Sequence, residues 1–183
     1  MTGGAAVVVR AKGITQILEG DYAGGFSNLL DAGSNLFMMS RLKACFVAGT
    51  PMMVVGGDKA IETLKDYETF GEACDWVWSR AENDPDGELV PRRMLRRFEN
   101  VAPVLNLHLR DRIIGTTAEH PFWEKEKGWT NAFELKIGDV VRLADGWTEV
   151  LGIADCGQIE RVHNCEVEGD HTYFECSKVK PRL

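Results

Sequence analysis

After residue 44 the chain alternates between short apolar runs and clusters of turn-forming residues. The runs are rich in Val, Ile, Leu and aromatic residues, and several place apolar side chains at every second position. Clusters of Gly, Asp, Asn and Pro separate them. The pattern predicts strands over residues 52–55, 75–79, 90–98, 104–109, 112–116, 140–143, 149–153, 161–167 and 172–176. Many short strands joined by frequent turns predict an all-β fold, either a sandwich or a barrel-like sheet.

Helical patterns are confined to short or N-terminal segments. Residues 61–64 and 132–135 each predict a single helical turn, and no long helix is predicted after residue 44. Residues 1–44 are rich in Gly and Ala. One helical face there would carry Phe26, Leu29, Leu30, Gly33, Leu36, Phe37 and Ser40. We therefore expect a partly helical N-terminal flanking segment, 1–44, and an all-β domain, 45–183. The helix either packs on the domain or ends another protein that is joined to it.

Composition and charge narrow the classes of partner. The 183 residues, 44% of them hydrophobic, suffice for one domain with a buried core and an extension. A formal net charge of -7 argues against a nucleic-acid partner, which needs clustered Lys and Arg. The one basic run, residues 92–97, is short and is expected to be a solvated strand face. We expect a monomer.

The cysteines and the absence of long apolar stretches bear on the compartment. Five cysteines, an odd number with no Cys-x-x-Cys pair, are typical of reduced thiols in a cytosol-like compartment. The apolar run 5–9 is too short for a signal peptide, and no stretch reaches transmembrane length. We expect cytoplasmic synthesis and no membrane partner. A larger secreted precursor, with an export signal elsewhere, stays open.

Two separate segments supply candidate chemistry. Thr117 and His120 follow the predicted strand 112–116, and a hydroxyl and an imidazole this close can polarise a carbonyl and protonate a leaving nitrogen. Cys45 lies where the composition changes, and its thiol can attack the preceding carbonyl through a five-membered ring, which converts the Ala44–Cys45 amide into a thioester. Taken singly, none of these residues implies catalysis: Cys45 would be a buried thiol, Thr117 a hydroxyl at a strand end and His120 a surface histidine. Together, each supplies a part of self-cleavage that the others lack.

Three blocks in a fixed order make the pattern specific. They are CFVAGTP at residues 45–51, TAEHPFW at residues 117–123 and VHNCEVEGDHTYF at residues 162–174. In this order they resemble the Hint (hedgehog/intein) domains, and within them the bacterial intein-like and pretoxin Hint domains. The resemblance covers residues 45–174 and implies a horseshoe-like, all-β Hint fold of many short strands.

The resemblance also implies roles for five residues. Cys45 would be the nucleophile of an N-to-S acyl shift. His120 would hold and protonate the scissile nitrogen, and Thr117 would stabilise the oxyanion or strain the peptide. His171 matches a histidine that assists later steps in relatives. Asn164 stands where many inteins have an aspartate that helps to activate the cysteine; because an amide cannot act as a base, Asn164 would only orient groups or bind the carbonyl.

The third block contains a misleading match. Residues 163–165 spell His-Asn-Cys, as at the end of a splicing intein, but the predicted strand-turn-strand 166–174 continues without a break. After residue 174 the sequence has no His-Asn block, so no succinimide route is expected. We therefore expect single-turnover cleavage at Ala44–Cys45, with the chain's own N-terminal flanking segment as substrate and water or a small nucleophile resolving the thioester. If the parent protein is a polymorphic toxin, the family-level expectation is release of an effector.

Two alternatives stay open from the sequence alone. One is a Hint fold that no longer cleaves and serves as a structural or linker module. The other is a zinc-binding module, with ligands drawn from His163, Cys165, His171 and Cys176, whose spacing fits no familiar zinc pattern. We expect no cofactor and no metal.

Overall fold

The computed structural model describes residues 43–175. The predicted helix in segment 1–44 and the last residue of the predicted strand 172–176 lie outside the described residues. No helix in the described range is long and apolar enough to cross a lipid bilayer. The described chain is mostly antiparallel sheet, with one short α-helix and three turns of 3-10 helix.

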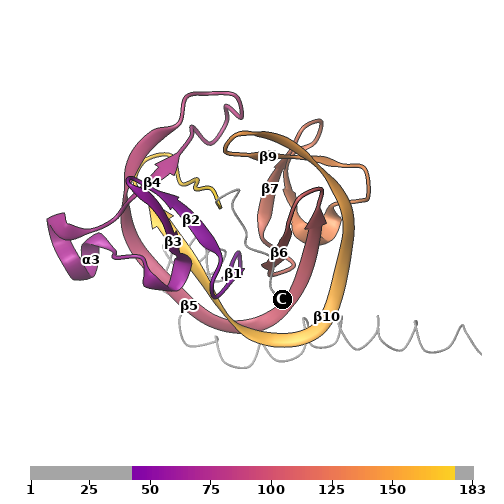
Figure 1. Ribbon diagram of the computed structural model, residues 1–183, viewed down its shortest axis with the longest axis horizontal. Helices are drawn as coiled ribbons and strands as arrows, with labels where there is room; N and C mark the ends of the chain where they lie inside the picture. Colours follow the sequence, from indigo (N-terminus) through magenta and orange to yellow (C-terminus); the bar gives the residue numbers. More distant parts are fainter. Residues whose placement is uncertain (1–42, 176–183) are drawn as a thin grey trace, which may run out of the picture. The chain divides into compact units, whose positions relative to one another are not determined.

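One ten-stranded antiparallel sheet contains every named strand of the described range. Its spatial order is β3-β2-β4-β5-β6-β1-β10-β9-β7-β8, and β5 also pairs with β10 (Figure 1). The elements are β1 (Phe46–Val47), β2 (Pro51–Val54), β3 (Gly57–Ala60), η1 (Ile61–Thr63), α3 (Tyr67–Phe70), η2 (Gly71–Ala73), β4 (Trp76–Ser79), β5 (Val90–Leu109), β6 (Ile113–Thr116), β7 (Pro121–Glu124), β8 (Gly128–Asn131), η3 (Ala132–Glu134), β9 (Val140–Leu143) and β10 (Gly146–Val167).

Two long strands form the frame of the sheet. β5 has 20 residues and β10 has 22, and they pair antiparallel and curve together around the core (Figure 1). The sequence predicted each of them as two shorter strands. In the structure β5 and β10 are each continuous, because a β-bulge in β10 lets the pairing continue past an irregular stretch. The register shifts there between Asp155 and Gln158, and Gly157 adopts a positive φ of 63°.

The first strand after the cysteine is short but enclosed. β1 lies between β6 and β10, with Phe46 opposite Thr116 on one side and His163 on the other. Gly115 in β6 allows this close approach, because a Cβ there would lie 2.7 Å from a methyl group of Val47. β1 therefore fixes Cys45 next to the end of β6.

Besides β1 and β3, which were not predicted as strands, one hairpin and one predicted strand differ from the sequence prediction. The hairpin of β7 and β8 was not predicted, because Pro121 and Glu124 interrupt the apolar alternation. The Glu124 carboxylate accepts hydrogen bonds from the backbone N–H groups of Glu126 and Lys127, at 2.8 and 2.7 Å, and so closes the hairpin turn. The predicted strand 172–176 is wrong: this segment makes one isolated bridge, Met52 with Glu175, because only one pair of residues there meets β2 in register.

Candidate functional site

A tight turn at residues 117–120 presents the predicted threonine and histidine. The backbone N–H of His120 donates to the Thr117 carbonyl at 3.2 Å and closes the turn. The His120 carbonyl accepts from Ala132 at 2.9 Å, which ties the turn to η3. Both ends of the turn are thereby held by the backbone, and the two side chains project from fixed positions.

Cys45 is fully buried, with 0% of its surface exposed, and contacts this turn through its backbone. Its N–H donates to Oγ1 of Thr117 at 2.9 Å. The carbonyl of Cys45 accepts from the Thr116 hydroxyl at 2.8 Å and from the Thr117 N–H at 2.9 Å. The Thr117 hydroxyl in turn donates to the Lys43 carbonyl at 2.5 Å. Thr117 therefore holds the nitrogen of the Ala44–Cys45 peptide bond.

His120 contacts the other end of the same amide. His120 is 7% exposed, and the backbone of Ala44 lies within hydrogen-bond reach of its imidazole. This neighbour raises the imidazole pKa, as expected where a ring faces a backbone carbonyl. Burial outweighs that effect and lowers the pKa of His120 to about 3, so the ring is neutral at pH 7. Its Nδ1 is buried and has no hydrogen-bond partner within the described residues.

The Cys45 thiol is also neutral. Burial, followed by the negative charge of Glu119, raises the pKa of the Cys45 thiol to about 12. Glu119 is half-buried and belongs to the same turn as His120. A thiol in this state attacks only if a base takes its proton during the reaction.

Asn164 is buried in β10 and acts as a hydrogen-bond acceptor. Its Oδ1 accepts from the backbone N–H of Cys165 at 2.7 Å and from the hydroxyl of Tyr173. The Tyr173 ring lies 6.4 Å from the ring of His120 and 6.1 Å from that of Phe46. Asn164 thus positions Tyr173 beside the histidine. Tyr173 stands within the third block, but no local pattern there distinguishes it as a site residue.

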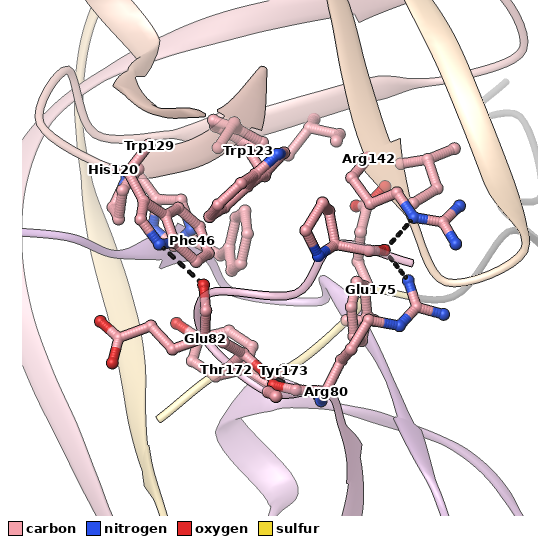
Figure 2. A pocket seen from close by; sticks show the side chains of 17 residues that line it. Phe46, Arg80, Glu82, His120, Trp123, Trp129, Arg142, Thr172, Tyr173 and Glu175 are labelled. Carbon is pink, nitrogen blue, oxygen red and sulfur yellow. Dashed lines mark hydrogen bonds between the residues drawn. The ribbon is translucent and has the colours of Figure 1, made fainter. Parts of the chain in front are cut away.

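A cavity of about 80 Å³ lies beside His120 (Figure 2). Phe46 and His120 line one part of it, and Trp129 contributes an indole whose N–H donates to the Glu82 carbonyl at 3.1 Å. Arg80 and Arg142 line another part. The volume is enough for a few water molecules or a small ligand. His120, which lies next to the Ala44 backbone, therefore also borders a space that a small molecule can enter.

Comparisons with known proteins identify the type of fold. Neither a scan against protein-family models nor a search of curated proteins finds a match. Among solved structures, the bacterial intein-like domain from Clostridium thermocellum is 27% identical, with a TM-score of 0.61 over 71% of this chain and 91% of that one. The described residues form a Hint-type domain. Two inteins share the fold: the DnaB intein from Synechocystis sp. PCC 6803 (21% identity, TM-score 0.59, 72% and 94% of the two chains) and the gp41-1 intein (20%, 0.57, 72% and 92%).

The Hint-type domain does not bring His171 into the cluster around Cys45. His171 is exposed, follows the turn after β10 and has a left-handed φ of 54°. It does not line the cavity. Its part in a later step therefore stays a prediction with no support from the site geometry.

The His-Asn-Cys sequence lies inside a strand of the Hint-type domain. His163 and Cys165 pair with Glu99 and Arg97 of β5, and β10 continues to Val167. A cut after Asn164 would therefore interrupt the longest strand pair. In the described residues, no group of three or more His, Cys, Asp or Glu side chains is placed to hold a metal ion.

Proposed function

We propose that this Hint-type domain cleaves the Ala44–Cys45 bond of its own chain by an N-to-S acyl shift, and that water or a small nucleophile then resolves the thioester. One observation carries the proposal: Thr117 and His120 contact opposite ends of the same amide, at the nitrogen of Cys45 and the backbone of Ala44. The likeness to a domain described as intein-like supports it.

The first step needs a base for the Cys45 thiol. A neutral imidazole has one donor and one acceptor nitrogen, so a His120 ring that donates to the Ala44 carbonyl can still accept a proton. As the sulfur bonds to the Ala44 carbonyl carbon, the thiol proton passes to His120. The carbonyl oxygen becomes an oxyanion, and the imidazolium beside it stabilises that charge.

The second step breaks the carbon–nitrogen bond. The Cys45 nitrogen is already oriented by Thr117 Oγ1, and it takes the proton that His120 acquired from the thiol. The oxyanion collapses to a thioester between Ala44 and the Cys45 sulfur, and the Cys45 nitrogen becomes a free amine. His120 returns to its neutral form, so the proton count balances without an external acid.

Cleavage by an added nucleophile tests the proposal. Incubation of the full chain with hydroxylamine or a small thiol should yield a fragment that ends at Ala44 and a domain that begins with Cys45, both identified by mass spectrometry. Cys45→Ala should abolish the fragment. Cys74→Ala, which removes another buried thiol, is the matched control and should cleave normally. A folded wild-type chain that keeps its intact mass under these conditions would contradict the proposal.

A further inference from the structure

Two arginine side chains converge at the end of the cavity away from His120. Arg80, which is 5% exposed, donates from Nη1 to the Pro85 carbonyl at 2.8 Å, and Arg142 donates from Nε to the same oxygen at 2.6 Å (Figure 2). Arg80 also donates to the Ala144 carbonyl at 3.3 Å. Two like charges are therefore held around a single neutral acceptor. Burial and then the charge of Arg142 lower the pKa of Arg80, as expected for an unfavourable pairing.

The carboxylates nearby offset these charges only in part. Asp86 lies 3.6 Å from Arg142, but its side chain is 72% exposed, so solvent screens the pair. Asp84 acts on Arg80 more weakly than Asp86 does. The Glu82 carboxylate points away from both arginines in Figure 2.

The remaining acid at the cavity is already engaged. Glu175 accepts from Arg112 at 3.3 Å, and burial raises the pKa of its carboxyl to about 7. Within the described chain, Nε of Arg80 is buried and has no acceptor. A buried donor without a partner is costly, and such sites are commonly completed by a ligand or an ion. An anion in this part of the cavity would relieve the repulsion between the two arginines.

We propose that the cavity binds the carboxylate of a small organic anion at Arg80 and Arg142, and that this site selects the nucleophile that resolves the thioester. The inference rests on the proposed function. With the carboxylate at the arginines, the other end of a short molecule points toward Phe46 and His120, and His120 lies next to the Ala44 backbone. The ligand class is a short thiol or amine that carries a carboxylate.

When the nucleophile is a thiol, the acyl group passes from the Cys45 sulfur to the sulfur of the external thiol. The incoming sulfur bonds to the Ala44 carbonyl carbon, and the bond between that carbon and the Cys45 sulfur breaks. The proton of the incoming thiol passes to the Cys45 sulfur. The products are a thioester of the N-terminal fragment with the external thiol and a free Cys45 thiol. No oxidant or reductant is required.

Matched thiols test the selection. Mercaptoacetate and mercaptoacetamide have similar size and differ in charge, so they are compared at equal thiolate concentration and equal ionic strength. We expect the anionic thiol to show a KM about tenfold lower, equivalent to about 1.4 kcal/mol. Arg142→Gln should remove the difference, and Arg142→Lys should restore part of it. Arg110→Gln, which removes an exposed charge outside the cavity, should keep the wild-type preference. Equal KM values for both thiols in the wild-type chain would overturn the inference.

A binding measurement separates this inference from the cleavage proposal. In the Cys45→Ala chain, propionate should shift the indole N–H signals of Trp123 and Trp129 in a saturable way, measured by proton–nitrogen NMR against a chloride titration. The shifts should be lost in the double variant with Arg142→Gln. Binding of propionate without any cleavage in the wild-type chain would sink the proposed function and keep the anion site. Cleavage by the wild-type chain, together with identical responses to propionate and chloride, would contradict the anion site and keep the proposed function.

Discussion

At the scale of single residues, burial makes the reacting groups neutral. The Cys45 thiol has a pKa raised to about 12 by burial and by Glu119, and the His120 imidazole has a pKa lowered to about 3 by burial. A thiolate–imidazolium pair is therefore not the resting state, which is compatible with the proposed reaction, in which the peptide bond persists until a nucleophile arrives. Proton transfer from sulfur to imidazole has to accompany the attack.

We expect the Thr117 hydroxyl, and not the rest of this side chain, to affect the rate of the proposed cleavage. Thr117→Val keeps the shape of the side chain but removes the acceptor of the Cys45 N–H, so cleavage should slow by about 10- to 100-fold, in line with the ~1–3 kcal/mol cost of a buried donor left unpaired. Thr117→Ser retains the hydroxyl and should stay within a few-fold of the wild type. Fragment yield against time in hydroxylamine measures both. Wild-type kinetics in the valine variant would refute this role.

Stability should depend on pH through His120. Its pKa is about 3 in the folded chain against 6.5 for an ordinary histidine, so between these values the unfolded chain binds a proton that the folded chain does not. Stability from this group should thus fall as pH drops from 6.5 toward 3, by about 1.4 kcal/mol per pH unit. His163 acts in the same direction, whereas Glu175, with its raised pKa of about 7, acts in the opposite one.

Comparison with His120→Asn isolates this contribution. Urea unfolding at pH 4.5, 5.5 and 6.5, in the Cys45→Ala background to prevent cleavage, should give a smaller loss of stability toward low pH in the asparagine variant. The contributions of His163 and Glu175 are common to both chains and cancel in the difference. Parallel pH dependences would show that His120 is not buried as a neutral ring.

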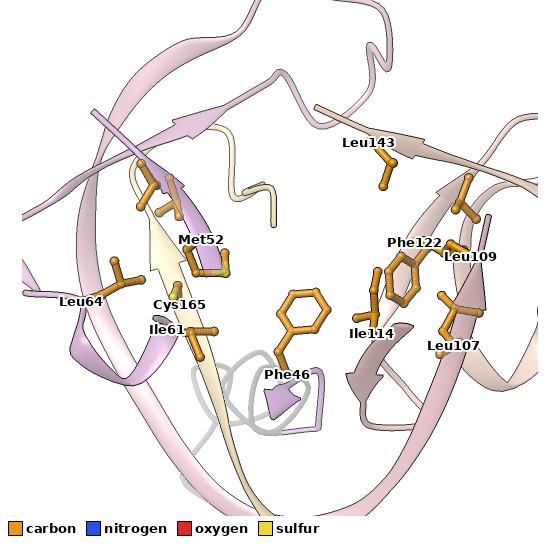
Figure 3. Close-up of a cluster of buried hydrophobic side chains, with 14 of the residues drawn as sticks. Phe46, Met52, Ile61, Leu64, Leu107, Leu109, Ile114, Phe122, Leu143 and Cys165 are labelled. Atoms are coloured by element: carbon orange, nitrogen blue, oxygen red, sulfur yellow. The ribbon is translucent and has the colours of Figure 1, made fainter. Parts of the chain in front are cut away.

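At the scale of elements, the short strand β1 determines whether the site is assembled. Its residue Phe46 lies in the core between a group that includes Met52 and Ile61 and a group that includes Ile114 and Phe122 (Figure 3). The same residue pairs with β6 and β10. Any displacement of β1 therefore moves Cys45 relative to Thr117.

Gly115→Ala should disturb this arrangement directly. The added Cβ would lie 2.7 and 2.9 Å from the two Val47 methyl groups, and a β-branched side chain in a strand has little freedom to move. We expect a loss of about 1–3 kcal/mol in the free energy of unfolding and slower cleavage. Gly152→Ala, whose nearest neighbour would be 3.8 Å away, is the matched control. Val47→Ala should restore part of the loss, and a Gly115→Ala chain as stable and active as the control would disprove the close contact.

The strands and turns followed from the sequence to different degrees. β9 was predicted over the same residues as observed, and both η1 and η3 were predicted as helical turns, because their apolar periodicity is local. The full length of β5 and β10 was not predicted, because the continuity of these strands depends on their pairing with each other across the sheet. Glu124 is buried at the end of β7 through three backbone N–H donors, which no local pattern reveals.

Cys45, Thr117 and His120 were proposed as site residues from the sequence, and that assignment stays a prediction; their contacts with one another could not be predicted. Cys45, Thr117 and His120 lie together, although the structure puts the Thr117 hydroxyl on the scissile nitrogen, where the histidine was expected. Asn164 accepts a hydrogen bond from the Tyr173 hydroxyl, and its predicted role in orienting groups at the site stays a prediction. The arginines of the cavity carried no signal in the sequence, because Arg80 follows β4, Arg142 lies in β9, and the two meet at the Pro85 carbonyl.

At the scale of the whole described domain, the segment after β10 joins distant parts of the sheet. The Phe174 carbonyl accepts from Met53 of β2 at 3.0 Å. The next residue, Glu175, accepts from Arg112 in the turn between β5 and β6, and the Arg112 side chain is 1% exposed. The buried ion pair therefore connects the residue that follows the third block to the β5–β6 hairpin, which leads to Thr117.

Arg112→Met should destabilise the domain in a pH-dependent way. It leaves Glu175 buried without its cation, at a typical cost of about 3–5 kcal/mol when the carboxylate is charged. Arg112 holds the Glu175 pKa down against burial, so its removal should raise that pKa above about 7. The variant should therefore lose more stability at pH 8 than at pH 5, where the carboxyl is protonated in both chains. Chemical unfolding at the two pH values measures this.

Arg110→Met is the control for this prediction. Arg110 pairs with Glu149 at 2.8 Å, but the two side chains are largely exposed, so the change should stay within about 0.5 kcal/mol at both pH values. Equal losses for Arg112→Met at pH 5 and pH 8 would mean that Glu175 is not the group that responds.

The complete burial of Cys45 also bears on the direction of the proposed reaction. Bond scission would turn its backbone nitrogen into a primary amine, and an ammonium enclosed beside a threonine hydroxyl is poorly solvated. The amine would thus remain unprotonated and nucleophilic, a short distance from the activated acyl group. Without an external nucleophile, re-formation of the peptide bond should therefore be faster than release of the N-terminal fragment. The uncut chain should accumulate until an outside molecule removes the acyl group irreversibly.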